Sequence, residues 1–205
     1  MQVNIAIIDY GAGNIGSVLN MYKKVGLKAS AARMPDDITA ATHVILPGVG
    51  AYDYCAKQLM ASNLLSAFKQ AALEDKKPVL GICVGFQLLF SRSEEGGYPG
   101  LAWLKGKVVK FDSDKLSSTQ KVPHMGWESI SHQGHPLFAG MNDPRFYFVH
   151  SYHAQPEQAQ DSIATCDYGY RFCAAAAQGN IMGVQFHPEK SHRFGMALLK
   201  NFAAI

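Results

Sequence analysis

The sequence has few cysteines, and none of them forms a paired motif. Only four of the 205 residues are cysteines, at positions 55, 83, 166 and 173. No two have the spacing of a CxxC motif, and no set has the spacing of metal ligands. This scarcity argues against a disulfide framework and against a zinc site. We expect a reduced protein with free thiols that uses no metal and no other cofactor.

Long apolar runs and clustered charges are also missing. No window approaches the roughly 18 uninterrupted apolar residues of a membrane span. Met1 is followed almost at once by a strand-like run that begins at Val3, with no basic segment of a secretory leader before it. Only 17% of the residues are charged, the net charge is +3, and lysines and arginines are scattered. We therefore expect an ordered cytoplasmic protein that binds no membrane and no nucleic acid.

The remaining composition is that of a globular enzyme-sized chain. Hydrophobic residues make up 48% of the sequence, which is enough for a well-buried core. Single domains most often have about 100–150 residues, but 205 residues are within reach of one α/β unit. No linker, repeat or low-complexity segment interrupts the chain. The sequence predicts a single domain over residues 1–205.

In the first half of the chain, strand-like runs alternate with helical patterns. We expect strands at 3–9, 42–46 and 78–82, and helices at 15–25, across 52–75 in two stretches, and at 85–91. Each expected strand is a short apolar run without helical period. Buried strands that alternate with helices imply parallel pairing, with helices on both faces of the sheet.

The second half contains short strands joined by short connections. We expect strands at 107–111, 127–131, 146–152, 163–167, 172–176 and 181–186, and a last helix at 192–203. Runs of strands without intervening helices favour an antiparallel layer. The predicted fold class is α/β, an open and mostly parallel sheet with helices on both faces and an added antiparallel layer.

The strongest chemical signal is the Gly-Ile-Cys-Val-Gly motif at 81–85. It is a cysteine version of the nucleophile elbow, a tight strand-to-helix turn that exposes its central residue at the carboxyl edge of a sheet. Larger side chains two positions either side would collide, which accounts for the glycines. The turn places Cys83 at a helix N-terminus, where the thiolate is favoured, and aims the N–H of Val84 at a developing oxyanion. A buried cysteine between packing glycines is the alternative, but the flanking strand and helix favour a nucleophile.

A cysteine nucleophile needs a histidine within hydrogen-bond reach and a third group to hold the ring. Among the eight histidines, His187 ends an apolar strand and is followed by Pro188 and Glu189. Pro188 biases His187 towards an extended conformation, and Glu189 can fold back to a ring nitrogen. A His-Pro-Glu tripeptide alone is more often an ordinary strand end. With the elbow, it completes a Cys83, His187 and Glu189 set at the ends of two strands that can be neighbours.

These motifs identify a family resemblance. The chain resembles class I glutamine amidotransferases, and among them the glutaminase subunits of imidazole glycerol phosphate synthases. The matching segments, in order, are 7–14, 46–51, 81–90, 93–96, 121–127, 147–152 and 183–191. The elbow and the His-Pro-Glu tripeptide are shared by the whole class. The Pro-His-Met-Gly-Trp segment at 123–127 and the Phe-His-Pro-Glu-Lys-Ser segment at 186–191 resemble this branch in particular.

The resemblance implies an enzyme that hydrolyses glutamine to glutamate and ammonia through a thioester. Cys83 would attack the side-chain amide. His187 would protonate the leaving ammonia and then activate water, and Glu189 would orient His187. The activity classes that we expect on this basis are hydrolase and lyase.

The resemblance also implies which groups hold the substrate. The loop at 47–50 would supply oxyanion N–H groups from Val49 and Gly50, and Val84 would supply another. The residues that would hold the amino-acid end of glutamine are Gln87, His150, Ser151 and Tyr152.

A partner protein is implied as well. Ammonia would pass directly to a separate synthase subunit, a (β/α)8-barrel cyclase in histidine biosynthesis, so that it is not lost to water as ammonium. The docking face of this heterodimer would surround the mouth of the site, and we expect Asn14, Trp127, Tyr147 and Lys190 on it. Trp127, at a loop-to-strand entry, would be the anchor. The alternative is that Trp127 and Tyr147 are core residues of the antiparallel layer.

Departures from the family pattern concern the partner more than the chemistry. Tyr52 stands where phenylalanine is usual, Glu128 stands where asparagine is usual, and the segment 101–105 is unusual. A synthase that aminates surface sugars is therefore an alternative partner. A stand-alone Cys-His hydrolase is an alternative of another class, but it would not need the 123–127 segment. A non-catalytic scaffold would not need all three triad positions to be filled.

Overall fold

Parallel strands form the centre of the structure, a computed structural model that describes residues 3–205. Met1, which enters the expectation of no secretory leader, lies outside the described residues. The parallel strands, in spatial order, are β2 (Ala29–Ala32), β1 (Ile5–Ile8), β3 (His43–Gly48), β4 (Val79–Cys83) and β12 (Ile181–Val184). Because these strands run the same way, their carboxyl ends share one edge of the sheet. That edge is where ligands bind in open α/β sheets.

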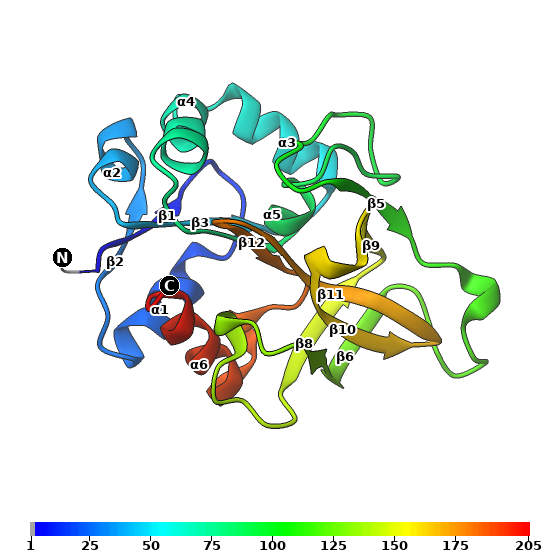
Figure 1. Cartoon of the computed structure of the whole chain (residues 1–205). Helices are drawn as coiled ribbons and strands as arrows, with labels where there is room; N and C mark the ends of the chain where they lie inside the picture. Colours follow the sequence, from blue (N-terminus) through cyan, green and yellow to red (C-terminus); the bar gives the residue numbers. More distant parts are fainter. Residues whose placement is uncertain (1–2) are drawn as a thin grey trace.

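Helices cover both faces of this sheet, as Figure 1 shows. One face carries α2 (Pro35–Thr39), α3 (Tyr52–Ala61) and α4 (Leu65–Lys69), which continues as a π-helical segment (Gln70–Glu74). The other face carries α1 (Ile15–Lys24) and α6 (His192–Phe202), which pack against each other. The buried residues of α6 are Gly195, Leu198, Leu199 and Phe202. Their helical spacing gives α6 one apolar stripe that faces the sheet.

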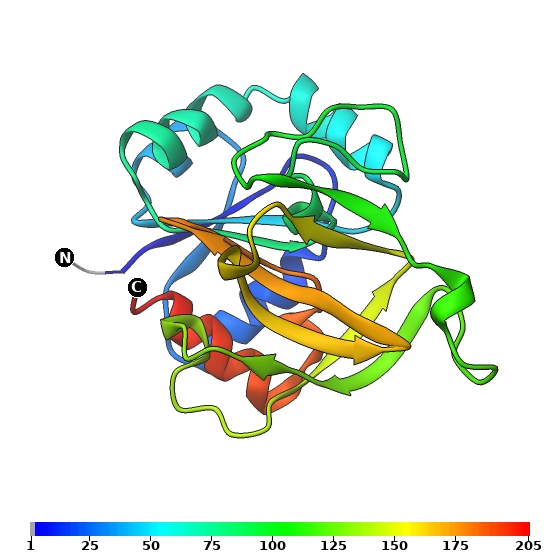
Figure 2. The same ribbon diagram turned by 45° about the vertical axis from the view of Figure 1, so that its right-hand side comes forward.

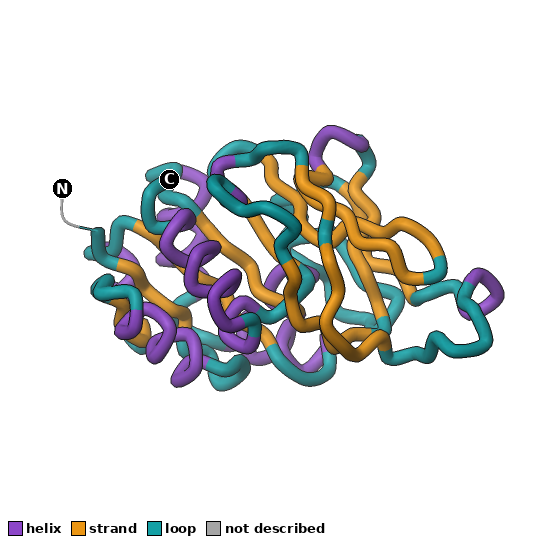
Figure 3. Tube along the Cα trace, turned by 90° about the horizontal axis from the view of Figure 1, so that it is seen from below, coloured by secondary structure: helices purple, strands orange, loops and turns teal. Residues whose placement is uncertain are grey.

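The antiparallel layer begins at β12. The strand β11 (Tyr170–Gln178) pairs with β12, and the sheet continues through β10 (Ser162–Tyr168) to β7 (Ser131–His132). From β11 a branch leads to β9 (Tyr152–Pro156) and β5 (Gly106–Lys110), and a separate sheet contains β6 (His124–Ser129) and β8 (Arg145–His150). Figures 2 and 3 show these strands beside the helix-covered part of the sheet. Short 3-10 helices lie at Ser113–Lys115, Pro136–Phe138, Ala159–Asp161 and Pro188–Lys190. The predicted fold class, an open parallel sheet with an added antiparallel layer, is confirmed.

Two elements of the parallel half were not predicted. The strand β2 reads Ala-Ser-Ala-Ala and lacks the β-branched residues that identify strands. It forms by pairing its backbone with β1 at the edge of the sheet. The helix α2 has only five residues, too few for a periodic pattern.

The helix expected at 85–91 is wrong in length. The helix α5 contains only Val84–Gln87. The carbonyls of Leu88, Leu89 and Phe90 instead accept hydrogen bonds from backbone N–H groups of the 101–104 segment. That segment closes over the elbow and ends the helix after one turn.

Two expected strands are also divided differently. The strand predicted at 146–152 is broken at Ser151, where the chain leaves β8 in the small sheet and enters β9 in the large one. The strand predicted at 127–131 begins three residues earlier, at His124. Trp127 therefore lies inside β6 rather than at a loop-to-strand entry. Sheet membership is decided by pairing with distant strands, which local pattern cannot show.

All four cysteines are free and buried. Within residues 3–205, no helix is long and apolar enough to cross a bilayer. The same range contains no group of three or more His, Cys, Asp and Glu side chains placed to hold a metal ion.

Tyr52 leaves a polar atom in the core. Its side chain is fully buried, and its hydroxyl has no hydrogen-bond partner within the described residues. Burial raises the pKa of Tyr52 to about 12. We expect Tyr52→Phe to stabilise the fold by about 1 kcal/mol, because an unsatisfied buried hydroxyl costs about that much or more. A thermal melt should show a rise of about 2–4 °C. A lower melting temperature would mean that the hydroxyl is satisfied by water.

Candidate active site

Cys83 occupies a strained turn between β4 and α5. Its backbone has φ +55° and ψ −111°, a conformation that non-glycine residues rarely adopt and that is found at functional sites. A Cβ on Gly85 would lie 1.9 Å from the carbonyl oxygen of Leu46, and one on Gly81 would lie 2.7 Å from the Cα of Phe86. Both glycines are therefore required by close backbone approach. Because α5 is a single turn, any dipole effect on the sulfur comes from the N–H groups of that turn.

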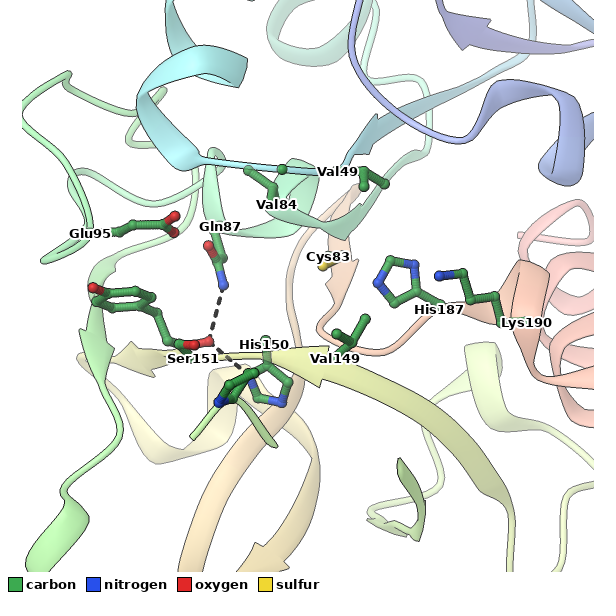
Figure 4. A pocket seen from close by; sticks show the side chains of 13 residues that line it. Val49, Cys83, Val84, Gln87, Glu95, Val149, His150, Ser151, His187 and Lys190 are labelled. Carbon is green, nitrogen blue, oxygen red and sulfur yellow. Dashed lines mark hydrogen bonds between the residues drawn. The ribbon is translucent and has the colours of Figure 1, made fainter. Parts of the chain in front are cut away.

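His187 and Glu189 form a buried pair beside Cys83. The Nδ1 atom of His187 lies 2.8 Å from Oε1 of Glu189, and the two side chains are 2% and 1% exposed. An Nδ1–H that donates to this carboxylate leaves Nε2 free for the Cys83 sulfur, and the ring lies next to that sulfur in Figure 4. Burial lowers the pKa of His187, but Cys83 and Glu189 together raise it to about 10. The arrangement therefore favours the imidazolium at neutral pH.

The backbone of His187 is fixed from the antiparallel layer. Its N–H donates to the carbonyl of Tyr147 at 2.9 Å. The Ser191 hydroxyl donates to the His187 carbonyl at 2.6 Å and accepts from the N–H of Tyr147 at 3.0 Å. The strand β8 thus determines where the ring sits relative to the elbow, which no local pattern could show.

A cavity of about 290 Å³ opens in front of Cys83. Its lining residues are Val49, Gly50, Cys83, Val84, Gln87, Glu95, Pro123, Val149, His150, Ser151, Tyr152, His187 and Lys190. Small-molecule sites measure about 300–1,000 Å³, so this cavity suits a compact ligand. Every predicted nucleophile, base, oxyanion and substrate residue lines it, and Glu189 lies behind His187.

The predicted oxyanion residues come from two loops in close contact. A Cβ on Gly48 would lie 2.4 Å from the N atom of Gly85, so the loop after β3 rests against the elbow. The Val49 carbonyl accepts a bond of 3.5 Å from the Cys55 thiol in α3. Because N–H and C=O of a trans peptide point in opposite directions, the N–H of Gly50 points away from α3. Val84, the residue after the nucleophile, is buried.

Gln87 and the β8–β9 junction form the far end of the cavity. The amide of Gln87 donates to the Tyr152 carbonyl and to Oε1 of Gln185, both at 3.1 Å. The same Tyr152 carbonyl accepts from Nδ1 of His150 at 2.8 Å. Dashed lines in Figure 4 mark the bonds from Gln87 and His150. The Oε1 atom of Gln87 is buried and has no partner within the described residues, so it is an unused acceptor at this end of the cavity.

Glu95 was not predicted as a site residue. Its side chain lines the cavity near Gln87, and its Oε1 atom accepts from the N–H of Tyr52 at 3.3 Å. Asp53 holds the loop by accepting from the N–H groups of Gly97 and Tyr98, at 3.1 and 3.0 Å. Burial raises the pKa of Glu95. The family resemblance of segment 93–96 could have indicated this residue. Whether the Glu95 side chain reaches the cavity, however, depends on how the loop folds.

Three of the four predicted docking residues form a chain of contacts that begins at the cavity. Lys190 lines the cavity, and its Nζ lies 5.6 Å from the ring centroid of Tyr147. The Tyr147 ring lies 6.2 Å from that of Trp127, which stacks on His192 at 5.4 Å. Trp127 is 36% exposed, which argues against the core alternative at that position. Asn14 follows β1 and caps α1 without a side-chain capping bond.

Comparison with known proteins gives one family. The family described as "Glutamine amidotransferase class-I" matches residues 6–205. The chain is 49% identical over 203 residues to imidazole glycerol phosphate synthase subunit HisH 2 of Pseudomonas aeruginosa, covering 98% of this chain and 99% of that relative. It is 47% identical over 200 residues to the subunit HisH of Sulfurimonas denitrificans, covering 97% and 96%.

Solved structures agree on the fold. A crystal structure of a glutamine amidotransferase superposes with a TM-score of 0.75 at 15% identity, covering 98% of this chain and 99% of that one. The structure of PurLQS from Thermotoga maritima gives a TM-score of 0.73 at 20% identity, covering 98% of each chain. At such identities the likeness concerns the fold alone.

Proposed function

The chain belongs to the class I glutamine amidotransferases, and on that premise we propose that it is the glutaminase subunit of an imidazole glycerol phosphate synthase. It would act as one domain over residues 1–205, in a cytoplasmic heterodimer. The observation that carries the chemistry is the buried His187–Glu189 pair, 2.8 Å apart, beside a cysteine on a strained elbow. This is the acyl-transfer arrangement of nucleophile, base and orienting acid.

In the first half of the proposed reaction, the Cys83 thiolate attacks the side-chain amide carbon of glutamine. A C–S bond forms, and the carbonyl π electrons move to oxygen. The N–H groups of Val84 and of the Val49–Gly50 loop stabilise this oxyanion, a contribution typically worth about 10²–10³ in kcat per donor. The His187 imidazolium then protonates the nitrogen, the C–N bond breaks, and ammonia leaves a thioester on Cys83.

In the second half, neutral His187 takes a proton from water as the water oxygen attacks the thioester carbon. The second oxyanion collapses, the C–S bond breaks, and glutamate leaves with Cys83 restored as thiolate. Glu189 stabilises the imidazolium in both halves and keeps Nδ1 protonated. The raised pKa of His187, about 10, fits a residue that holds its proton until the leaving nitrogen needs it.

The far end of the cavity suits an amino-acid head group. A free acceptor on Gln87 and the carboxylate of Glu95 can both bind an α-ammonium. Backbone N–H groups at Ser151 and Tyr152 are suited to the α-carboxylate. We propose that these contacts select free glutamine over a glutaminyl side chain in a peptide, since both ends of the head group are bound.

The partner follows from the relatives. Both of the relatives compared above are named as one subunit of imidazole glycerol phosphate synthase, so a cyclase subunit is the proposed acceptor of ammonia. The lyase class expected from the sequence does not fit this chain alone, because the groups around Cys83 perform amide hydrolysis and the relatives are named as single subunits.

The proposed function is tested by assaying glutamine hydrolysis with and without a purified cyclase subunit. We expect the free chain to be nearly idle and to be activated when the cyclase is added. A sugar-aminating synthase serves as the matched comparison. Activation by the sugar-aminating synthase and not by the cyclase would mean that the partner belongs to sugar amination rather than to histidine biosynthesis. Fast hydrolysis by the free chain would indicate a stand-alone hydrolase.

Trp127 is expected to anchor the partner. Truncating an exposed interface tryptophan commonly costs about 2 kcal/mol or more of binding free energy, so Trp127→Ala should weaken assembly by about thirtyfold. Titration calorimetry against the cyclase measures this, and a melt of the free variant checks the fold. The control is Leu73→Ala, an exposed residue in the π-helical segment that leads to the amino end of β4, away from the carboxyl edge of the sheet. Unchanged affinity with a large drop in melting temperature would make Trp127 a packing residue.

A further inference from the structure

Gln185 is a buried polar residue for which the proposed mechanism has no role so far. It follows β12, and its side chain is fully buried. Its backbone N–H donates to the carbonyl of Ala174 at 2.8 Å. The main chain alone therefore holds this position in the sheet. The side chain is free to serve another purpose, and its Nε2 atom points at the sulfur of Cys83 from 3.9 Å.

The orientation of the Gln185 amide is determined by a chain of hydrogen bonds. The Tyr152 carbonyl can only accept, so the Gln87 atom 3.1 Å away from it must be the nitrogen. The same nitrogen donates its second hydrogen to Gln185 at 3.1 Å, and the atom that receives it must be Oε1. Nε2 of Gln185 is then left to face Cys83. A flipped amide would place two NH₂ groups against each other and an oxygen against the sulfur.

We infer that Gln185 is a catalytic residue whose side-chain N–H donates to the Cys83 thiolate. The inference rests on the proposed function, in which this sulfur is the nucleophile. A neutral donor suits the position because it stabilises the anion without adding a charge that would compete with His187. Cys83 is only 5% exposed, so little water is available to solvate the thiolate, and protein donors must replace it.

The same chain links the nucleophile to the substrate end of the cavity. Gln87 donates to Gln185 with one hydrogen and to the Tyr152 carbonyl with the other. A ligand that binds at Gln87 and at the Tyr152 backbone tightens the two contacts that orient Gln185. Substrate binding and thiolate stabilisation thus share one set of hydrogen bonds.

The test is the pH profile of Cys83 alkylation by iodoacetamide, followed by intact mass. It compares the full chain with Gln185→Met, which keeps the side-chain length and removes both polar atoms, and with Gln185→Leu, a smaller apolar side chain that also lacks a donor. Gln155→Met, the same change at an exposed position in β9, is the matched control. The buried Cys55, Cys166 and Cys173 report unfolding if they become labelled.

We expect the midpoint of the profile to rise by about one pH unit in both Gln185→Met and Gln185→Leu, with labelling below the midpoint about tenfold slower. Gln155→Met should match the unmodified chain. If Gln185→Met fails to fold, Gln185→Leu decides. An unchanged midpoint in a folded variant overturns the role of Gln185 while leaving the glutaminase proposal intact. Absence of Cys83 labelling in the unmodified chain would overturn both.

Discussion

Cys83→Ala is expected to abolish glutamine hydrolysis while the protein still folds and binds its partner. Without the sulfur there is no covalent route, and loss of a nucleophile costs on the order of 10⁴-fold or more in kcat. The alanine removes one buried atom from a position held mainly by backbone, so the fold should persist. Steady-state hydrolysis with the cyclase present measures the loss, and titration calorimetry confirms that assembly survives.

An electrophilic glutamine analogue gives the matching positive result. Such a reagent should label Cys83 and spare Cys55, Cys166 and Cys173, which are buried and lack both the elbow and a partner histidine like His187. Burial raises the pKa of the Cys166 and Cys173 thiols to about 12, so they are also poor nucleophiles. Labelling of another cysteine with Cys83 untouched would falsify the nucleophile assignment.

Replacing the two partners of Cys83 should give unequal losses. His187→Gln removes the proton carrier and should approach the loss seen for Cys83→Ala. Glu189→Gln keeps the size of the side chain and removes the charge that stabilises the imidazolium, so its loss in kcat should be smaller by roughly two orders of magnitude. Values of kcat for both variants, measured in the assembled enzyme, decide this. Equal and complete losses would mean that Glu189 does more than orient His187.

The Glu189 variant also predicts a pH effect with a defined sign. The pKa of His187 is raised from 6.5 to about 10, so the stability from pairing its charged form is fully present below about pH 6.5 and is lost as the pH rises through about 10. Removing the Glu189 charge lowers the pKa of His187 and moves this loss to lower pH. In thermal melts between pH 6 and 10, the melting temperature of Glu189→Gln should therefore begin to fall at a lower pH than that of the unmodified chain. Parallel curves of melting temperature against pH for the two proteins would contradict the pairing of His187 with Glu189.

Much of the fold could be predicted because its strands are locally distinctive. The buried strands β1, β3 and β4 are apolar runs that no helix pattern resembles. The features of the fold that the sequence did not predict share one cause. The edge strand β2 has little side-chain signal, and the break at Ser151 reflects a change of pairing partner from β6 to β5. Such pairings join segments far apart in the chain, and period alone does not encode them.

The chemistry was determined by the sequence itself, and the surroundings of that chemistry by the tertiary structure. Backbone clash requires a glycine two positions either side of Cys83. The reach of a side chain requires the acid two residues after His187. Both requirements are local, so the spacing of the sequence shows them. Glu95 and Gln185 could not be found in that way. Gln185 meets Gln87 across 98 positions and Cys83 across 102. Only the parallel pairing of β12 with β4 brings these side chains to one edge, because a hydrogen bond depends on distance in space and not on separation along the chain.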